Sequence, residues 1–301
     1  MKIAYIFRGQ PRQTSICSRL FRHYTLDRMP QHDFTTHIYA WSTTNTNSGG
    51  TVQTPHQHNR AQLKDRLTQE YKPQSIHVAD DTVHYRDICM EYAKYSGLNS
   101  VVVYWKLSQV IAEIRAQQQL LDYCIQNDYE PDLIVDTRTE AFHWIHGDFF
   151  ERSVDKLDKQ SDSILVHHLL SMDPHRSVAD FTFVYNMNTL KNMCKENSHT
   201  RVQNSLYSDT THNELINNNT WNSHTLYPLI AHTNQDYIEI AINQLKLTVV
   251  NDAHNSNILT EEATLANYFL YSESQEQLMG NPLDVDLDAI HNTLYTKLKI
   301  Y

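Results

Sequence analysis

Glycine is scarce in this chain, at 6 of 301 residues, against a usual share of about 7%. Neither the G-x-G-x-x-G fingerprint of dinucleotide-binding folds nor the G-x-x-x-x-G-K-[ST] pattern of P-loop proteins occurs. A nucleotide would therefore have to be held without a glycine-rich phosphate loop. A divalent cation held by acidic side chains is one way to do this, because such a cation neutralises phosphate charge.

Cysteine pairs and an excess of positive charge are absent as well. The four cysteines are far apart and form no Cys-x-x-Cys pair, so neither a disulfide framework nor a zinc site is expected, and a reducing cytosol fits best. The net charge is −10. We expect no nucleic-acid partner, because duplex binding draws its affinity from clustered Lys and Arg.

Long apolar runs are also missing. No run approaches the ~20 residues that a membrane span needs, and the N-terminal run ends at Arg8, which is too short for a signal peptide. We therefore expect no membrane span and a cytoplasmic protein, in the host cytoplasm if the protein is viral. The sequence does not specify an oligomeric state.

Hydrophobic residues make up 40% of the chain and charged residues 20%, which is typical of a globular protein. Strand and helix patterns alternate, and this predicts an α/β fold with a mainly parallel, Rossmann-like central sheet flanked by helices. Strands are expected at residues 2–7, 34–41, 75–78, 133–135, 163–167, 180–185 and 245–250. Helices are expected to begin at 14 or 15 and to cover 61–71, 101–126, 189–195 and 261–271.

No linker long enough to force two independent domains is present, but the composition shifts to Asn, Thr and His beyond residue 200. We predict a core over residues 1–200 and a C-terminal extension over 201–301 that packs on the same domain.

The most informative segment is 131–140. Three apolar residues, Leu133 to Val135, predict a buried strand, and Asp136, Arg138 and Glu140 follow at alternate positions. Alternate side chains of an extended chain point the same way, and open α/β sheets bind ligands at the carboxyl ends of their strands. The two carboxylates are thus candidate ligands for a divalent cation. The structural alternative is a polar loop with an internal Asp–Arg ion pair.

Three further features are candidates for function. Arg8, Gln10 and Arg12 follow the first strand, where arginine forks match phosphate geometry; the alternative is a solvated turn. Asp180 opens an aromatic strand and is interpreted as a general base, an acceptor for sugar hydroxyls or a turn former. For Trp41, at the end of the second strand, a packing role is favoured.

Taken in order, these motifs resemble a group of small glycosyltransferase-like proteins from polysaccharide-biosynthesis loci and phage genomes. The resemblance covers about residues 1–195 and is most specific at residues 132–140. That group is similar to the GT-A fold, in which a nucleotide sugar binds a Rossmann-like sheet through an Asp-x-Asp-type metal motif. Here the motif reads Asp-Thr-Arg-Thr-Glu, and Tyr185-Asn186 stands where relatives tend to have Gly-Ser.

The resemblance implies a glycosyltransferase that moves a sugar from a nucleoside diphosphate sugar to a saccharide or other acceptor. Asp136 and Glu140 would hold Mg²⁺ or Mn²⁺. The nucleotide would lie against the loop after the first strand, formed by Arg8, Gly9, Gln10, Pro11 and Arg12. Arg138 and Asp180 would be the catalytic residues, and the extension after residue 200 would form the acceptor side.

Two other functions remain open. The substituted acids and the missing Gly-Ser pair favour a non-catalytic protein that binds a nucleotide or carbohydrate on the same fold. A metal-dependent nucleotidyl or phosphoryl transferase on a similar sheet is the third possibility.

Overall fold

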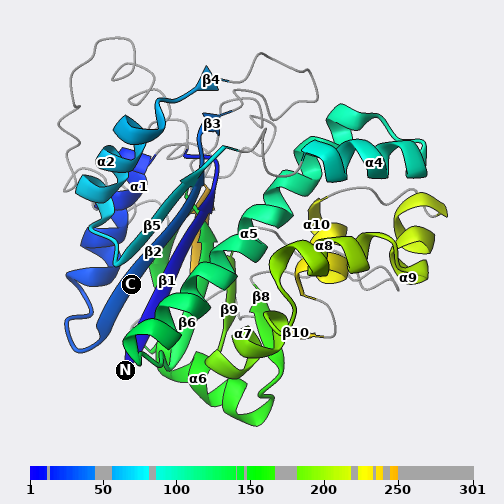
Figure 1. Ribbon diagram of the computed structural model, residues 1–301. Coiled ribbons are helices and arrows are strands. Elements are labelled where there is room, and N and C mark those ends of the chain that lie inside the picture. Colours follow the sequence, from blue (N-terminus) through cyan, green and yellow to red (C-terminus); the bar gives the residue numbers. More distant parts are fainter. Residues whose placement is uncertain are drawn as a thin grey trace, which may run out of the picture.

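The computed structural model describes residues 1–11, 14–44, 56–80, 86–139, 141–145, 148–166, 182–217, 223–232, 235–239 and 245–249. A central sheet of seven strands runs through this part of the chain (Figure 1). Its order is β10-β8-β9-β6-β1-β2-β5. The strands are β1 (Lys2–Gly9), β2 (Asp33–Trp41), β5 (Ser75–Ala79), β6 (Leu133–Arg138), β8 (Ser163–Val166), β9 (Thr182–Tyr185) and β10 (Asp236–Glu239).

All neighbouring strands in this sheet are parallel except β9, which is antiparallel to both β6 and β8. The predicted α/β fold with a mainly parallel, helix-flanked sheet is confirmed. Two small antiparallel pairs stand outside the central sheet. They are β3 (Thr43–Thr44) with β4 (His56–Gln57), and β7 (Ala141–Ile145) with β11 (Leu245–Val249).

Helices cover both faces of the sheet and enclose two hydrophobic cores. One core lies between the sheet and α1 (Thr14–Phe21), α2 (Arg60–Tyr71) and α6 (Phe149–Lys159). The other is built around α5 (Ser100–Asn127), with α4 (Arg86–Ser96), α7 (Met187–Met193), α8 (Ser198–Leu206) and α10 (Ser223–Leu226). The described residues also form four short elements: η1 (Arg22–Leu26), α9 (Asp209–His212), η2 (Asn213–Asn217) and η3 (Tyr227–Ala231).

Local sequence accounts for the bounds of several helices. The Asn59 side chain accepts hydrogen bonds from two backbone N–H groups at the start of α2, and Lys72 adopts a left-handed conformation (φ 50°) just before Pro73 ends the helix. In α5, the longest helix of the described residues, one side packs on β1 and β2, and other sides pack on α4, α8, α10 and η3, so that its middle, Val110 to Ile114, is buried all round. Among the helices of the described residues, none is long and apolar enough to cross a membrane.

The element predictions hold for the central strands and for α2 and α5, and the predicted helix at 261–271 lies outside the described residues. The strand predicted at 245–250 exists as β11, but it pairs with β7 and not with the central sheet. The sequence patterns missed α4, α6, α8, β7 and β10. The chain beyond residue 200 contributes β10 to the central sheet. It also contributes most of α8, and η3, to the core around α5.

A buried histidine on β2 makes the stability of the fold depend on pH. His37 is 1% exposed, its ring nitrogens contact the hydroxyls of Ser75 (2.9 Å) and Thr35 (3.1 Å), and burial lowers its pKa to about 4. The unfolded chain binds a proton near pH 6.5 and the folded chain does not, so stability falls as the pH drops through this range. Between pH 7.5 and 5.0 we expect His37 to contribute a loss of about 2 kcal/mol.

Urea denaturation at both pH values gives the free energy of unfolding that each protein loses between them. The loss in wild type minus the loss in His37→Gln is the contribution of His37. His199→Gln, at an exposed position on α8, is the matched control and should keep the wild-type pH dependence. Equal losses in wild type and His37→Gln would contradict the assignment.

Candidate functional site

The two central strands, β1 and β6, end side by side at one edge of the sheet. They are parallel and in register, with Ile3 opposite Leu133 and Arg8 opposite Arg138. The chain passes from β1 to β2 on one side of β1, whereas β6 lies on its other side. Such a reversal of strand order leaves a crevice at the carboxyl ends of the strands, where open α/β sheets bind their ligands.

A small pocket occupies this position, and we call it the switch-point pocket. Its volume is about 20 Å³, room for about one water molecule. It lies where strands β1, β2 and β6 end, with α5 and η3 closing its inner side. The described residues that line it are Arg8, Gly9, Gln10, Trp41, Gln109, Arg138 and Tyr227.

The turn after β1 brings backbone groups to the surface of this pocket. Gly9 has φ 98°, a conformation that residues with a side chain rarely adopt, and a Cβ built on it would meet no atom within 4 Å. The buried Thr139 fixes the turn, because its hydroxyl donates to the Gln10 carbonyl and its N–H donates to the Arg8 carbonyl. The backbone at Gly9 is therefore held in place and open to the close approach of a ligand.

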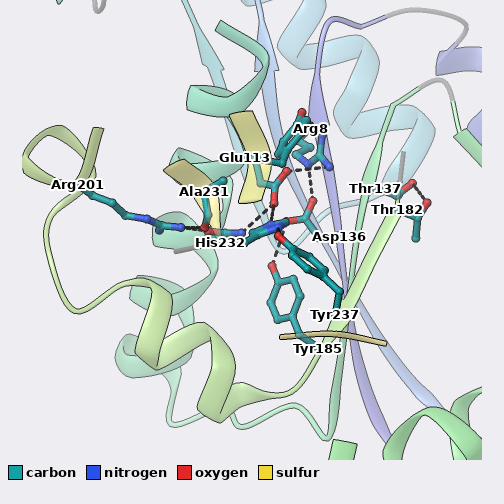
Figure 2. Close-up of polar contacts among 12 residues, drawn as sticks. Arg8, Glu113, Asp136, Thr137, Thr182, Tyr185, Arg201, Ala231, His232 and Tyr237 are labelled. Carbon is teal, nitrogen blue, oxygen red and sulfur yellow. Dashed lines mark hydrogen bonds and ion pairs between the residues drawn. The ribbon is translucent and has the colours of Figure 1, made fainter. Parts of the chain in front are cut away.

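Behind the pocket lies a buried charge network centred on Arg8 (Figure 2). All three nitrogens of the Arg8 guanidinium have a partner. Nε donates to Asp136 Oδ1 at 2.6 Å, Nη2 pairs with Glu113 Oε2 at 2.9 Å, and Nη1 donates to the Tyr227 hydroxyl at 3.2 Å. Arg8 is 2% exposed and both carboxylates are fully buried. Its charge is thus compensated inside the protein.

The Asp136 carboxylate is held on both of its oxygens. Arg8 occupies Oδ1, and the Tyr185 hydroxyl donates to Oδ2 at 3.0 Å. Burial raises the pKa of Asp136 to about 7, with Glu113 adding to the rise and Arg8 opposing it. The same carboxylates outweigh the effect of burial on Arg8 and hold its pKa well above the usual value. Asp136 therefore belongs to the interior ion pair and does not line the pocket.

His232 extends the network through its contact with Glu113. Its Nε2 contacts Glu113 Oε1, and its Nδ1 lies 2.9 Å from the Tyr237 hydroxyl. Burial lowers the pKa of His232 well below its usual value; Asp136 opposes this effect, and Arg201 and Arg8 add to it. A neutral imidazole that donates from Nε2 and accepts at Nδ1 satisfies both contacts. Arg201 contacts the Ala231 carbonyl next to this histidine (Figure 2).

Side-chain alternation explains how these residues meet. On β1, Ile3, Tyr5 and Phe7 face the core under α1 and α2, so Arg8 points to the opposite face, toward α5. Asp136 and Arg138 alternate with Val135 in the same way and lie on the α5 side of the sheet.

Sequence reasoning missed several members of the network: Glu113, Tyr185, Tyr227 and His232. A signal existed for Glu113, because it lies with Gln117 at i, i+4 spacing on α5, between apolar residues that are buried. A carboxylate at a buried helical position needs a charged partner. The sequence offers no comparable signal for the other three, which come from distant elements.

The structure brings together part of the predicted site. Arg8, Gly9, Gln10 and Arg138 line the switch-point pocket, and Pro11 is buried directly after them. Asp136 is nearby, but in the buried charge network. Arg12, Glu140 and Asp180 lie outside the described residues, so their roles stay predictions.

The described residues do not fit the predicted divalent metal. Asp136 has both oxygens engaged, by Arg8 and by Tyr185, and none of its surface is exposed. In the described part of the chain, no three His, Cys, Asp or Glu side chains are grouped so that they could hold a metal ion. The placement of Asp136 thus does not favour its role as a metal ligand, and the prediction for Glu140 remains.

No family model and no curated protein matches this chain. Several solved structures are similar to it, and two of them are described here. One is the galactosyltransferase LgtC in complex with donor and acceptor sugar analogs, with 7% identity, 81% of this chain and 74% of that chain covered, and a TM-score of 0.44. The other is mouse xyloside xylosyltransferase 1 in its apo form, with 8% identity, 81% and 86% covered, and a TM-score of 0.42. Likeness of this degree does not assign an activity to the chain.

Proposed function

We propose that this protein is a glycosyltransferase that binds a nucleoside diphosphate sugar at the carboxyl edge of its sheet. One observation carries the proposal. At the reversal of strand order, Gly9, Gln10 and Arg138 meet around the switch-point pocket, which is where an open α/β sheet binds its ligand. The half-buried backbone at Gly9 and a guanidinium are both suited to a diphosphate.

Arg8 and Arg138 take different parts in this proposal. The charge of Arg8 is compensated by Asp136 and Glu113, so Arg8 positions the end of β1. Arg138 is half-buried at the pocket and is the cation that faces the ligand. As the acceptor hydroxyl attacks the anomeric carbon, the bond from that carbon to the nucleoside diphosphate breaks. Arg138 would then stabilise the charge that develops on the leaving diphosphate.

Replacing Arg138 with glutamine is expected to weaken binding of UDP or GDP about 10- to 100-fold, since a hydrogen bond to a charged group contributes about 1.5–3 kcal/mol. Titration calorimetry measures the affinity. Arg152→Gln is the matched control, because Arg152 is an exposed arginine on α6, paired with Asp148 and away from the pocket. Unchanged nucleotide affinity in Arg138→Gln would remove the support for this site.

The same titration in Mn²⁺ and in EDTA tests the metal prediction. If Glu140 holds a cation, Mn²⁺ should tighten nucleotide binding and Glu140→Gln should abolish most of that gain. Equal affinity in both conditions would show that the site binds the diphosphate without a metal, through Arg138 and backbone N–H groups.

The engagement of Asp136 in the buried charge network favours a second candidate, a protein that binds a nucleotide or carbohydrate without catalysis. Incubation with a panel of nucleotide sugars distinguishes the two. Release of UDP or GDP supports a transferase, whereas binding without release supports the second candidate. Two further roles stay predictions that belong to the glycosyltransferase proposal. They are the acceptor role of the chain beyond residue 200 and the role of Asp180.

A further inference from the structure

A second and larger pocket lies on the α5 side of the sheet, over the edge strand β5. It has a volume of about 710 Å³, within the range of small-molecule binding sites. The C-terminal half of α5 forms one wall, and residues on β2 and β5 form the floor. We call it the α5–β5 groove. It is separate from the switch-point pocket, because the two share no lining residue, and their nearest lining residues on α5, Gln109 and Arg115, lie about 9 Å apart along the helix.

The strand order explains why the groove exists. Strand β5 is the last strand of the sheet, and α5 lies across β1 and β2. In the register of β2 and β5, His77 lies opposite Tyr39 and Ser75 lies opposite His37. The side chains of Ser75 and His77 therefore point to the same face of the sheet as those partners, the α5 side. Helix α5 approaches the floor through Gln119, whose Nε2 donates to the Ser75 hydroxyl at 2.7 Å. Beyond this contact the floor is open, and His77 is exposed.

Side-chain amides dominate the lining of the groove. They belong to Gln74, Gln118, Gln119, Gln126 and Asn127. Hydrogen bonds within the protein fix one end of two of these amide groups. The Gln74 oxygen accepts the Thr36 N–H at 2.6 Å, and the Asn127 nitrogen donates to the Tyr123 carbonyl at 2.9 Å. An amide both donates and accepts hydrogen bonds, as does each hydroxyl of a sugar.

An aromatic pair adds a flat apolar surface to these amides. The rings of Tyr39 and His77 stack, with centroids 5.2 Å apart and planes 19° apart. Tyr39 is buried and holds the plane of the exposed His77 ring. The C–H face of a pyranose ring packs on such a surface while its hydroxyls reach polar groups at the rim.

The charge of the groove narrows the choice of ligand. The charged side chains among its described lining residues are Arg115 and Asp122, one of each sign. An anionic ligand such as a nucleotide or an acidic polymer would find no excess of positive charge here. A peptide added to the sheet would lie along the outer edge of β5, whereas the groove lies over the face of that strand.

From the amide lining, the oriented aromatic ring and the balanced charge, we infer that the α5–β5 groove binds a neutral oligosaccharide, at a site separate from the switch-point pocket. The inference does not rest on the proposed transferase activity.

The test uses the full-length protein and neutral hexasaccharides of glucose, mannose, galactose or N-acetylglucosamine, screened by titration calorimetry. We expect at least one to bind. His77→Ala and Gln126→Ala should each weaken that hexasaccharide about fivefold, the effect of one lost contact of about 1 kcal/mol. Ile125→Ala, at a neighbouring position on α5 that is 71% exposed and outside the groove, should bind as wild type does.

A thermal melt of each variant shows that it is folded before its affinity is compared. Added UDP should leave hexasaccharide binding unchanged, because the lining of the groove offers a diphosphate no excess of positive charge. The inference is overturned if no hexasaccharide binds, if both groove variants bind like wild type, if UDP competes, or if only acidic glycans or peptides bind.

Discussion

Replacing Arg8 with methionine is expected to lower the free energy of unfolding by about 3–5 kcal/mol at pH 8. The change leaves Asp136 and Glu113 without their shared cation at positions where neither carboxylate is exposed. Removing one member of a buried ion pair costs far more than breaking an exposed pair, because the remaining charge cannot be solvated. Urea denaturation of wild type and Arg8→Met at pH 8 measures the loss.

The pH dependence of this loss identifies its cause. Without Arg8, which lowers the pKa of Asp136, the folded variant should bind a proton at this carboxyl up to a higher pH than the folded wild type does. Its stability should therefore rise relative to wild type as the pH falls from 8 to 5.5. Arg152→Met, which breaks an exposed pair with Asp148, is the control and should change stability by less than about 1 kcal/mol. A loss below about 1 kcal/mol in Arg8→Met at pH 8 would contradict the ion-pair role.

Replacing Trp41 with alanine should destabilise the protein by about 3–5 kcal/mol. Trp41 is 1% exposed and is packed in the core around α5, with its ring edge-on to Tyr39 at 5.5 Å. Its Nε1 donates to the Ser108 carbonyl on α5 at 3.2 Å. The side chain thus joins the end of β2 to the helix that covers it, and its removal leaves a large cavity.

Trp41→Phe separates the packing from the hydrogen bond. It keeps an aromatic ring in the core and loses the N–H donor, so a loss of about 1–3 kcal/mol is expected. Both variants are measured by urea denaturation, with nucleotide affinity determined alongside because Trp41 also lines the switch-point pocket. Unchanged stability of Trp41→Ala together with a loss of nucleotide binding would show that the residue serves the ligand and not the core.

The architecture could be predicted from the sequence because its signals are local. Apolar runs such as Leu133–Val135 indicate strands buried on both faces, and the apolar spacing in α5 indicates a helix with one buried side. Alternation with helices then requires crossover connections and a mainly parallel sheet. Elements with weaker patterns were missed, among them β10, whose four residues are all partly or fully exposed.

Alternation also predicted, from the sequence alone, that Asp136 and Arg138 share one side of their strand. Arg8 was expected in the turn after the first strand, whereas it lies within β1. Alternation could not distinguish an arginine that is partly exposed from one that is buried. Arg8 and Arg138 both lie at the carboxyl end of a central strand, yet Arg8 is 2% exposed and Arg138 is half-buried at the pocket. The difference comes from Glu113, Tyr227 and His232, which only tertiary packing places around Arg8. A charge is stable inside a protein only when such partners surround it, so the tertiary structure alone decided which of these two arginines belongs to the interior and which lies at the pocket.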